Sequence, residues 1–206
     1  GMALFLGIIV PLYTFFILKR KVDVYNAGAI AATYGSVSAV TFVTAVAFLQ
    51  QSGIDFGGHM IAALAIMESP AIIVGVILIG RYGDNRGKTT LKQVLHEAFT
   101  NGSVFIILLS LIIGLVISDQ QYAGVKPFSE NLFKGILSLF MLDMGLLAGK
   151  RISGLKHGGV FLVGFGLIIP LINAFVTMLL CPLFGISLGN ALLLTILAAS
   201  ASYIAV

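Results

Sequence analysis

Seven apolar segments, separated by short stretches that hold most of the charged residues, dominate this sequence of 206 residues. About 20 apolar residues are needed for a helix to cross roughly 30 Å of hydrocarbon. Within lipid, a helix is also the simplest way for a segment to satisfy its own backbone hydrogen bonds. The sequence therefore predicts an all-α, polytopic membrane protein. The predicted spans are 2–18, 27–49, 58–80, 101–118, 132–149, 159–180 and 187–206.

Composition excludes several classes of protein. Hydrophobic residues make up 59% of the chain and charged residues 10%, and mean hydropathy is +1.08. Soluble domains carry about 25% charged residues, so a soluble enzyme, a disordered tail and a DNA-binding domain are excluded, and no nucleic-acid partner is expected. The single Cys181 rules out an intrachain disulfide or a cysteine-based metal site. No phosphate-binding loop, catalytic triad or zinc motif is recognisable, which argues against an enzyme.

The basic residues predict the orientation of the spans. One set of alternate loops holds ten of them and the other set only two, Lys126 and Lys134, so the positive-inside rule places the first set in the cytoplasm. The first span therefore runs from outside to inside. The cytoplasmic set is Lys19, Arg20, Lys21, Arg81, Arg86, Lys88, Lys92, Lys150, Arg151 and Lys156.

The loop 81–100 is the largest predicted cytoplasmic segment. Its apolar residues recur at helical spacing with polar residues between them, which favours a short amphipathic helix on the membrane surface. A docking surface for a cytoplasmic regulator is the alternative. The apolar positions are Leu91, Val94, Leu95, Ala98 and Phe99.

Two stretches of the chain resemble each other. The motif GIIVPL at 7–12 recurs as GLIIPL at 166–171, and in the next span each is followed by a tract of small polar residues, at 35–39 and 199–203. The two motifs lie five crossings apart, so the two copies would be antiparallel, as in the inverted repeats of secondary transporters.

This repeat predicts the domain organisation. Residues 1–80 would be the last three helices of a first repeat, and 101–206 the first four helices of a second. The segment 81–100 would connect them in the cytoplasm. We expect a five-plus-five helix protein, of which about seven helices are present here and which is truncated at both ends.

The two polar tracts are the main candidate site. If the helices break there, their N-terminal N–H groups would face an anion with a partial charge of roughly +0.5. Freed carbonyls and hydroxyls would supply the oxygen ligands that sodium prefers. Alternatively, these serines and threonines only bond to the preceding turn or allow helices to approach closely. The candidate residues are Gly35, Ser36, Ser38, Thr41, Ser200 and Ser202.

Glu68 is the second candidate, because a carboxylate in the middle of a span costs at least ~2.5–3.5 kcal/mol unless it faces a polar cavity or carries a proton. It is followed by Ser69 and by Pro70, which frees carbonyls one turn earlier. We expect Glu68 and Ser69 to join the ion site. The alternative is a protonated Glu68 that caps an interrupted helix.

Two other polar residues within predicted spans have structural interpretations. Asp143 is expected to be a buried acid paired near Lys150 and Arg151, with Gly145 and Gly149 forming a small-residue helix contact nearby. Asn173 is expected to make a hydrogen bond between helices.

At these residues the sequence resembles the sodium-dependent bicarbonate permease family, best known from cyanobacteria. The resemblance runs through nearly the whole chain. Its most specific parts are YGSVSAVTF at 34–42, MESPA at 67–71, the region from Phe133 to Gly145, and ASASYIA at 199–205. Cyanobacterial members carry aspartate at the positions of Glu68 and Tyr203, which leaves the coupling ion open.

The resemblance implies ten helices in two inverted repeats, with core and gate subdomains and usually a trimer. It also implies sodium-coupled bicarbonate uptake, with both ligands held by the spans that contain Gly35–Thr41 and Ser200–Ser202. Certain members bind a small PII-like regulator on the cytoplasmic face.

We therefore expect sodium-coupled symport of a small inorganic anion across the plasma membrane, with bicarbonate the leading candidate. No organic cofactor is expected, and sodium would be held at Ser36, Ser38, Glu68 and Ser202. One alternative is a carrier for another small anion or a carboxylate. Another is a non-transporting membrane receptor or scaffold that uses the loop 81–100.

Overall fold

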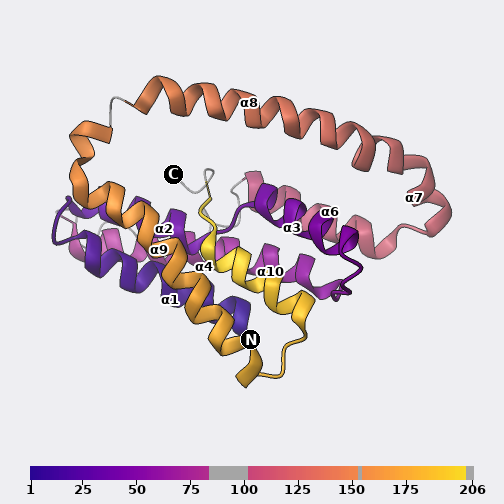
Figure 1. The fold of residues 1–206 in the computed structure, drawn as a ribbon, viewed down its shortest axis with the longest axis horizontal. Helices are drawn as coiled ribbons and strands as arrows, with labels where there is room; N and C mark the ends of the chain where they lie inside the picture. The colour runs from indigo at the N-terminus through magenta and orange to yellow at the C-terminus, as the bar shows by residue number, and fades with distance from the viewer. Residues whose placement is uncertain (84–101, 153–154, 203–206) are drawn as a thin grey trace. The chain divides into compact units, whose positions relative to one another are not determined.

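The computed structural model describes residues 1–83, 102–152 and 155–202, and every regular element in these ranges is helical (Figure 1). Two compact units are formed, one by Gly1–Leu108 with Ile168–Val206 and the other by Leu109–Leu167. The elements are α1 (Met2–Leu18), α2 (Val24–Gly35), α3 (Ala39–Gln51), α4 (His59–Tyr82), α6 (Gly102–Val116), α7 (Asp119–Lys126), the π-helix η1 (Pro127–Leu132), α8 (Phe133–Arg151), α9 (Leu155–Leu183) and α10 (Leu188–Ala199).

The described helices other than α7 and η1 fall on the seven predicted apolar segments, and the all-helical prediction is confirmed for the described ranges. Helix α7 and η1 lie in the predicted loop between 118 and 132. The segment 27–49, however, is two helices, α2 and α3, and the last segment is helical only to Ala199. The predicted amphipathic helix at 91–99 lies outside the described residues.

Among the described residues, three helical segments are long and apolar enough to cross a membrane: Val24–Gln51, His59–Tyr82 and Gly159–Leu183. The helices α1 and α10 are apolar but shorter. Helix α6 has only 15 residues, and α8 carries four charged ones. The other four predicted spans therefore stay predictions.

Three helices of the first unit, α1, α2 and α4, pack closely because small residues line their contacts. A methyl group added at Gly7 would lie 3.1 Å from the carbonyl oxygen of Met67. One added at Gly75 would lie 2.8 Å from the Cβ of Ala32 and 3.1 Å from the carbonyl oxygen of Gly28. These glycines let backbones approach as small-residue motifs do in membrane helix pairs.

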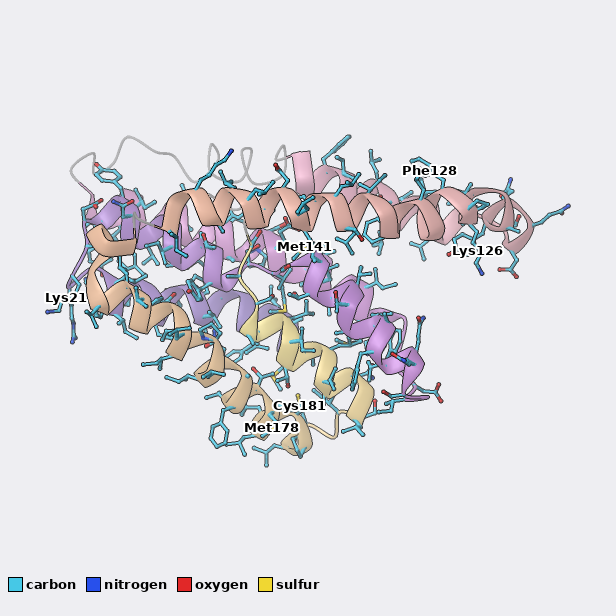
Figure 2. The ribbon with its side chains drawn as sticks, turned by 45° about the horizontal axis from the view of Figure 1, so that its top comes forward. Lys21, Lys126, Phe128, Met141, Met178 and Cys181 are labelled. Carbon is cyan, nitrogen blue, oxygen red and sulfur yellow. The ribbon has the colours of Figure 1, made fainter. Side chains whose placement is uncertain are left out.

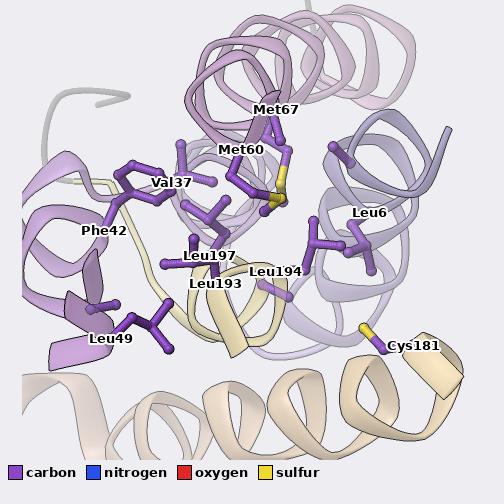
Figure 3. Packing of buried hydrophobic residues seen from close by; sticks show 14 residues of the cluster. Leu6, Val37, Phe42, Leu49, Met60, Met67, Cys181, Leu193, Leu194 and Leu197 are labelled. Carbon is purple, nitrogen blue, oxygen red and sulfur yellow. The ribbon is translucent and has the colours of Figure 1, made fainter. Parts of the chain in front are cut away.

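Helices α3 and α10 complete the buried core of this unit. Figure 3 shows Met60 and Met67 of α4 beside Leu193, Leu194 and Leu197 of α10. On the other side of α10 lie Val37, from the link between α2 and α3, and Phe42 and Leu49 of α3. The link between α2 and α3 is therefore surrounded by apolar side chains.

In the second unit, most described side chains are exposed. Helix α8 packs chiefly with η1, and its described side chains are mostly exposed, as Figure 2 shows around Met141. Asp143 is exposed, so the prediction of a buried, paired acid is wrong. The predicted small-residue contact is also wrong in the described structure, because Gly145 and Gly149 face open space.

Helix ends in the predicted loops are capped by polar side chains. The carboxylate of Asp23 accepts hydrogen bonds from the backbone N–H groups of Tyr25 and Asn26 at 3.1 and 3.0 Å. The hydrogen bonds from Asn26 lower the pKa of Asp23, which favours the ionised form at the start of α2. Ser118 and Gln121 form a capping box at the start of α7.

We expect Gly75→Ala to lower the free energy of unfolding by about 1–3 kcal/mol, because the added methyl group meets Ala32 and the Gly28 backbone. The matched control is Gly80→Ala on the same helix, where an added methyl group meets nothing within 4 Å. This control should be neutral or more stable by up to about 1 kcal/mol, since alanine favours helix. Thermal unfolding in detergent compares the two, and equal stability of both variants would contradict the close contact.

Candidate ion and anion site

The first polar tract interrupts a helix, as the sequence predicts. Helix α2 ends at Gly35, Ser36 and Ser38 have extended backbones, and α3 begins at Ala39. The Oγ of Ser38 accepts a hydrogen bond from the N–H of Thr41 at 3.3 Å and thereby caps α3. A serine at this position favours a new helix start because its hydroxyl pairs an otherwise unpaired N–H group.

Gly35 ends α2 at a point of close contact. A methyl group there would lie 2.5 Å from Cδ of Pro11 and 3.0 Å from Cβ of Ala71. Pro11 belongs to the repeated motif on α1 and Ala71 to α4, so both neighbouring helices touch the chain just before the break. The first copy of the motif thus holds the end of α2 in place.

The second polar tract follows α10, which ends at Ala199. Ser200 has an extended backbone, and its Oγ donates a hydrogen bond to the carbonyl oxygen of Leu197 at 2.8 Å. Ser202 is also described, and it is buried. Residues 203–206 lie outside the described residues, so a helix beyond this tract stays a prediction.

The structure brings the two tracts together, although they are 162 residues apart in sequence. The backbone N–H of Ser38 donates to the Oγ of Ser200 at 3.1 Å. The backbone N–H of Ser202 donates to the carbonyl oxygen of Thr33 at 2.9 Å. Each tract therefore contributes one backbone N–H group, that of Ser38 or Ser202, which finds its acceptor in the other part of the chain. Without these acceptors the two groups would be unpaired within an apolar core.

Ser36 lies between these two hydrogen bonds and has an unusual environment. Its side chain is 1% exposed, and its Oγ has no hydrogen-bond partner among the residues that the structure describes. A buried hydroxyl without a partner costs about 1–3 kcal/mol. Such an atom marks a place where a ligand or an ordered water would be stabilised.

Helix ends give this region both signs of partial charge. The C-terminal ends of α2 and α10 direct carbonyl oxygens toward the tracts, and the N-terminal end of α3 directs N–H groups there. Carbonyl and hydroxyl oxygens suit a hard cation, whereas N–H groups suit an anion. The described residues thus supply donors and acceptors for both kinds of ion.

Glu68 is 5% exposed and lies on α4, which is a continuous helix from His59 to Tyr82. The alternative in which Glu68 caps an interrupted helix is therefore wrong, because the helix accommodates Pro70 without ending. Glu68 precedes Ala71 by three residues and shares its helix face, and Ala71 borders Gly35. Within the described chain the carboxylate of Glu68 has no ion-pair or hydrogen-bond partner.

Two other predicted site residues, Thr41 and Ser69, take no part in the hydrogen bonds that join the two tracts. Thr41 is exposed, and its hydroxyl donates to the carbonyl oxygen of Ser38 at 2.9 Å, so it supports the start of α3. Ser69 is half-buried and joins none of the described hydrogen bonds between the tracts.

Sequence reasoning did not find the carbonyl oxygen of Thr33, which accepts the hydrogen bond from Ser202. A backbone acceptor has no side-chain signature in a sequence, so only the fold reveals it. The hydrogen bond expected for Asn173 is confirmed, because the hydroxyl of Tyr13 on α1 donates to Oδ1 of Asn173 on α9.

Comparison with known proteins identifies a family for this chain. The family model of the Na+-dependent bicarbonate transporter superfamily matches residues 1–206. The comparison with curated proteins finds no match. This superfamily consists of transporters and not of enzymes, and the three long apolar helices are those of a membrane protein. Because the match covers the whole chain, including both polar tracts, this protein belongs to the Na+-dependent bicarbonate transporter superfamily.

Proposed function

We propose that the protein carries out sodium-coupled symport of a small inorganic anion, with bicarbonate as the substrate, across the plasma membrane. The observation that carries the proposal is the pairing of the break between α2 and α3 with the end of α10 through Ser38 and Ser200, beside the hydroxyl of Ser36, which has no partner among the described residues. Family membership supports the choice of bicarbonate and sodium.

In this proposal the two ions occupy complementary parts of the region. Sodium binds to oxygen atoms, namely hydroxyls of the tracts and carbonyls at the ends of α2 and α10, with Glu68 as the nearby negative charge. Bicarbonate binds to the N–H groups at the start of α3. Each ion lowers the electrostatic cost of the other, so the doubly loaded site crosses the membrane interior more easily than a half-loaded one.

The same proposal extends to the architecture of the whole transporter. Residues 1–80 and 101–206 belong to two inverted repeats, joined by the cytoplasmic segment 81–100. The contact of Pro11 with Gly35 supports a shared structural role for the repeated motif, since it lies directly before the break. A homotrimer and a PII-like regulator on the cytoplasmic face are further elements of the proposal, and both rest on resemblance to the family.

The basic experiment is uptake of labelled bicarbonate by the full-length protein in proteoliposomes, with and without an inward sodium gradient. Uptake that requires sodium supports the proposal. Uptake that is indifferent to sodium would contradict the coupling. An absence of flux would contradict the transport function and favour a receptor role, whereas inhibition by a competing short carboxylate would point to another anion as substrate.

We expect Ser36→Ala to weaken sodium-dependent bicarbonate uptake about tenfold or more while leaving the ligand-free protein equally or more stable. The physical reason is that this hydroxyl has no described partner to lose, so its removal relieves a buried unpaired group. Uptake in proteoliposomes and thermal unfolding without sodium are the two measurements.

The matched control for Ser36→Ala is Thr44→Val, which removes an exposed hydroxyl that bonds within α3. It should leave both quantities near their original values. If Ser36→Ala lowers stability and leaves the affinity for both ions unchanged, the hydroxyl has only a structural role. Ser202→Ala provides a second test of the same site and should also weaken substrate binding.

We expect Glu68→Gln to raise the sodium concentration for half-maximal uptake by about tenfold or more, since it removes the buried negative charge nearest the break while keeping the shape of the side chain. The measurement is bicarbonate uptake as a function of sodium concentration. Asp143→Asn makes the same chemical change on an exposed position and should leave the sodium response unchanged. An unaltered response in Glu68→Gln would exclude this residue from coupling.

A further inference from the structure

Four basic residues lie at the ends of two neighbouring helices, away from the polar tracts. Helix α1 ends at Leu18 and is followed directly by Lys19, Arg20 and Lys21, while Arg81 lies in the last turn of α4. Arg20, Lys21 and Arg81 are exposed, and Figure 2 shows Lys21 pointing away from the helices. The positive-inside rule predicts that these helix ends lie at the cytoplasmic surface of the membrane.

Aromatic rings hold the two helix ends together. The Nζ of Lys19 lies 4.1 Å from the ring centroid of Tyr82 on α4 and 4.5 Å from that of Phe16 on α1. The ring centroids of Phe16 and Tyr82 are 5.8 Å apart, edge to face. Because the faces of aromatic rings attract cations, Lys19 links the end of α1 to the residue beside Arg81. The four basic residues therefore form one basic cluster that combines both helix ends.

The charge of the basic cluster is not neutralised by the described part of the chain. None of its four cations forms an ion pair with a described residue. The acid that follows in sequence, Asp23, accepts hydrogen bonds from the N–H groups of Tyr25 and Asn26 and from the side-chain amide of Asn26, so it is engaged at the start of α2. Like charges held together repel one another, and an anion bound among them removes this repulsion.

Exposed apolar side chains lie one helical turn before the cations. Phe16 is 39% exposed and lies four residues before Arg20. Ile77 is 41% exposed and lies four residues before Arg81, on the same face of α4. Each helix therefore presents an apolar side chain at the depth of the hydrocarbon and a cation at the level of the headgroups.

This combination specifies the partner. A soluble anion would neutralise the basic cluster but leave the neighbouring apolar side chains uncovered, whereas a phospholipid supplies a phosphate and hydrocarbon in one molecule. Basic groups at the cytoplasmic ends of membrane helices attract anionic headgroups. We infer that the basic cluster binds the phosphate of an anionic phospholipid, whose acyl chains contact Phe16 and Ile77. The guanidinium groups of Arg20 and Arg81 suit this role, because their planar donors match phosphate oxygens.

The test titrates the purified full-length protein in detergent with dioleoylphosphatidylglycerol and measures binding by native mass spectrometry. Dioleoylphosphatidylcholine has the same acyl chains but a zwitterionic headgroup, so it should bind at least about tenfold more weakly. Arg20→Gln, Lys21→Gln and Arg81→Gln should each weaken binding of the anionic lipid by roughly fivefold, which is the effect of one basic residue near an anionic surface. The matched control is Lys126→Gln, an exposed position outside the basic cluster, which should bind as the wild type does.

A further variant separates the charge of the cluster from its packing. Lys19→Met removes the charge but keeps an unbranched apolar side chain against Phe16 and Tyr82, so it should fold normally and bind the anionic lipid more weakly. Thermal unfolding without lipid checks that this variant and the three exposed substitutions fold as the wild type does.

Three outcomes would overturn the inference. One is equal binding of the two lipids by the wild type. Another is an unchanged preference for the anionic lipid when Arg20, Lys21 and Arg81 are all replaced by glutamine. The third is displacement of the lipid by an equal concentration of glycerol 3-phosphate, since the cluster would then recognise a free phosphate and not a membrane lipid. All three measurements are independent of sodium and bicarbonate transport.

Discussion

The hydrogen bond from the backbone N–H of Ser38 to the hydroxyl of Ser200 is the interaction on which the candidate site depends. It joins the break between α2 and α3 to the chain just after the end of α10, inside an apolar core where an unpaired backbone group is costly. A second hydrogen bond, from the N–H of Ser202 to the carbonyl oxygen of Thr33, also joins the segment after α10 to the end of α2. Without these two contacts, the backbone N–H groups of Ser38 and Ser202 would be left unpaired in an apolar surrounding.

Close packing around the break explains why the chain tolerates it. Pro11 and Ala71 press against Gly35 from the two neighbouring helices, and Phe42 and Leu197 bury the link between α2 and α3. An apolar surrounding of this kind strengthens electrostatic interactions relative to those in water. The glycine that ends α2 is also the residue that permits this close contact, so the packing of α1 and α4 determines where the candidate site begins.

Much of this arrangement could be predicted from residue patterns. Apolar segments indicated where most of the helices lie, and small polar residues within the second segment indicated the break between α2 and α3. The exposure of Asp143 was not predicted, because the burial of a side chain depends on tertiary contacts that an apolar run of sequence does not give. The continuity of α4 through Pro70 was also missed, since a proline in a long apolar helix can be accommodated by its surroundings.

The sequence by itself determined that this is a helical membrane protein, where its helices lie and which short tracts carry the polar chemistry. Those properties follow from local hydropathy and from the backbone preferences of glycine and serine. Only the tertiary structure decided that Ser38 meets Ser200, that Ser36 is buried without a described partner, and that Lys19 meets Tyr82. These depend on contacts between segments up to 162 residues apart, which no local pattern encodes.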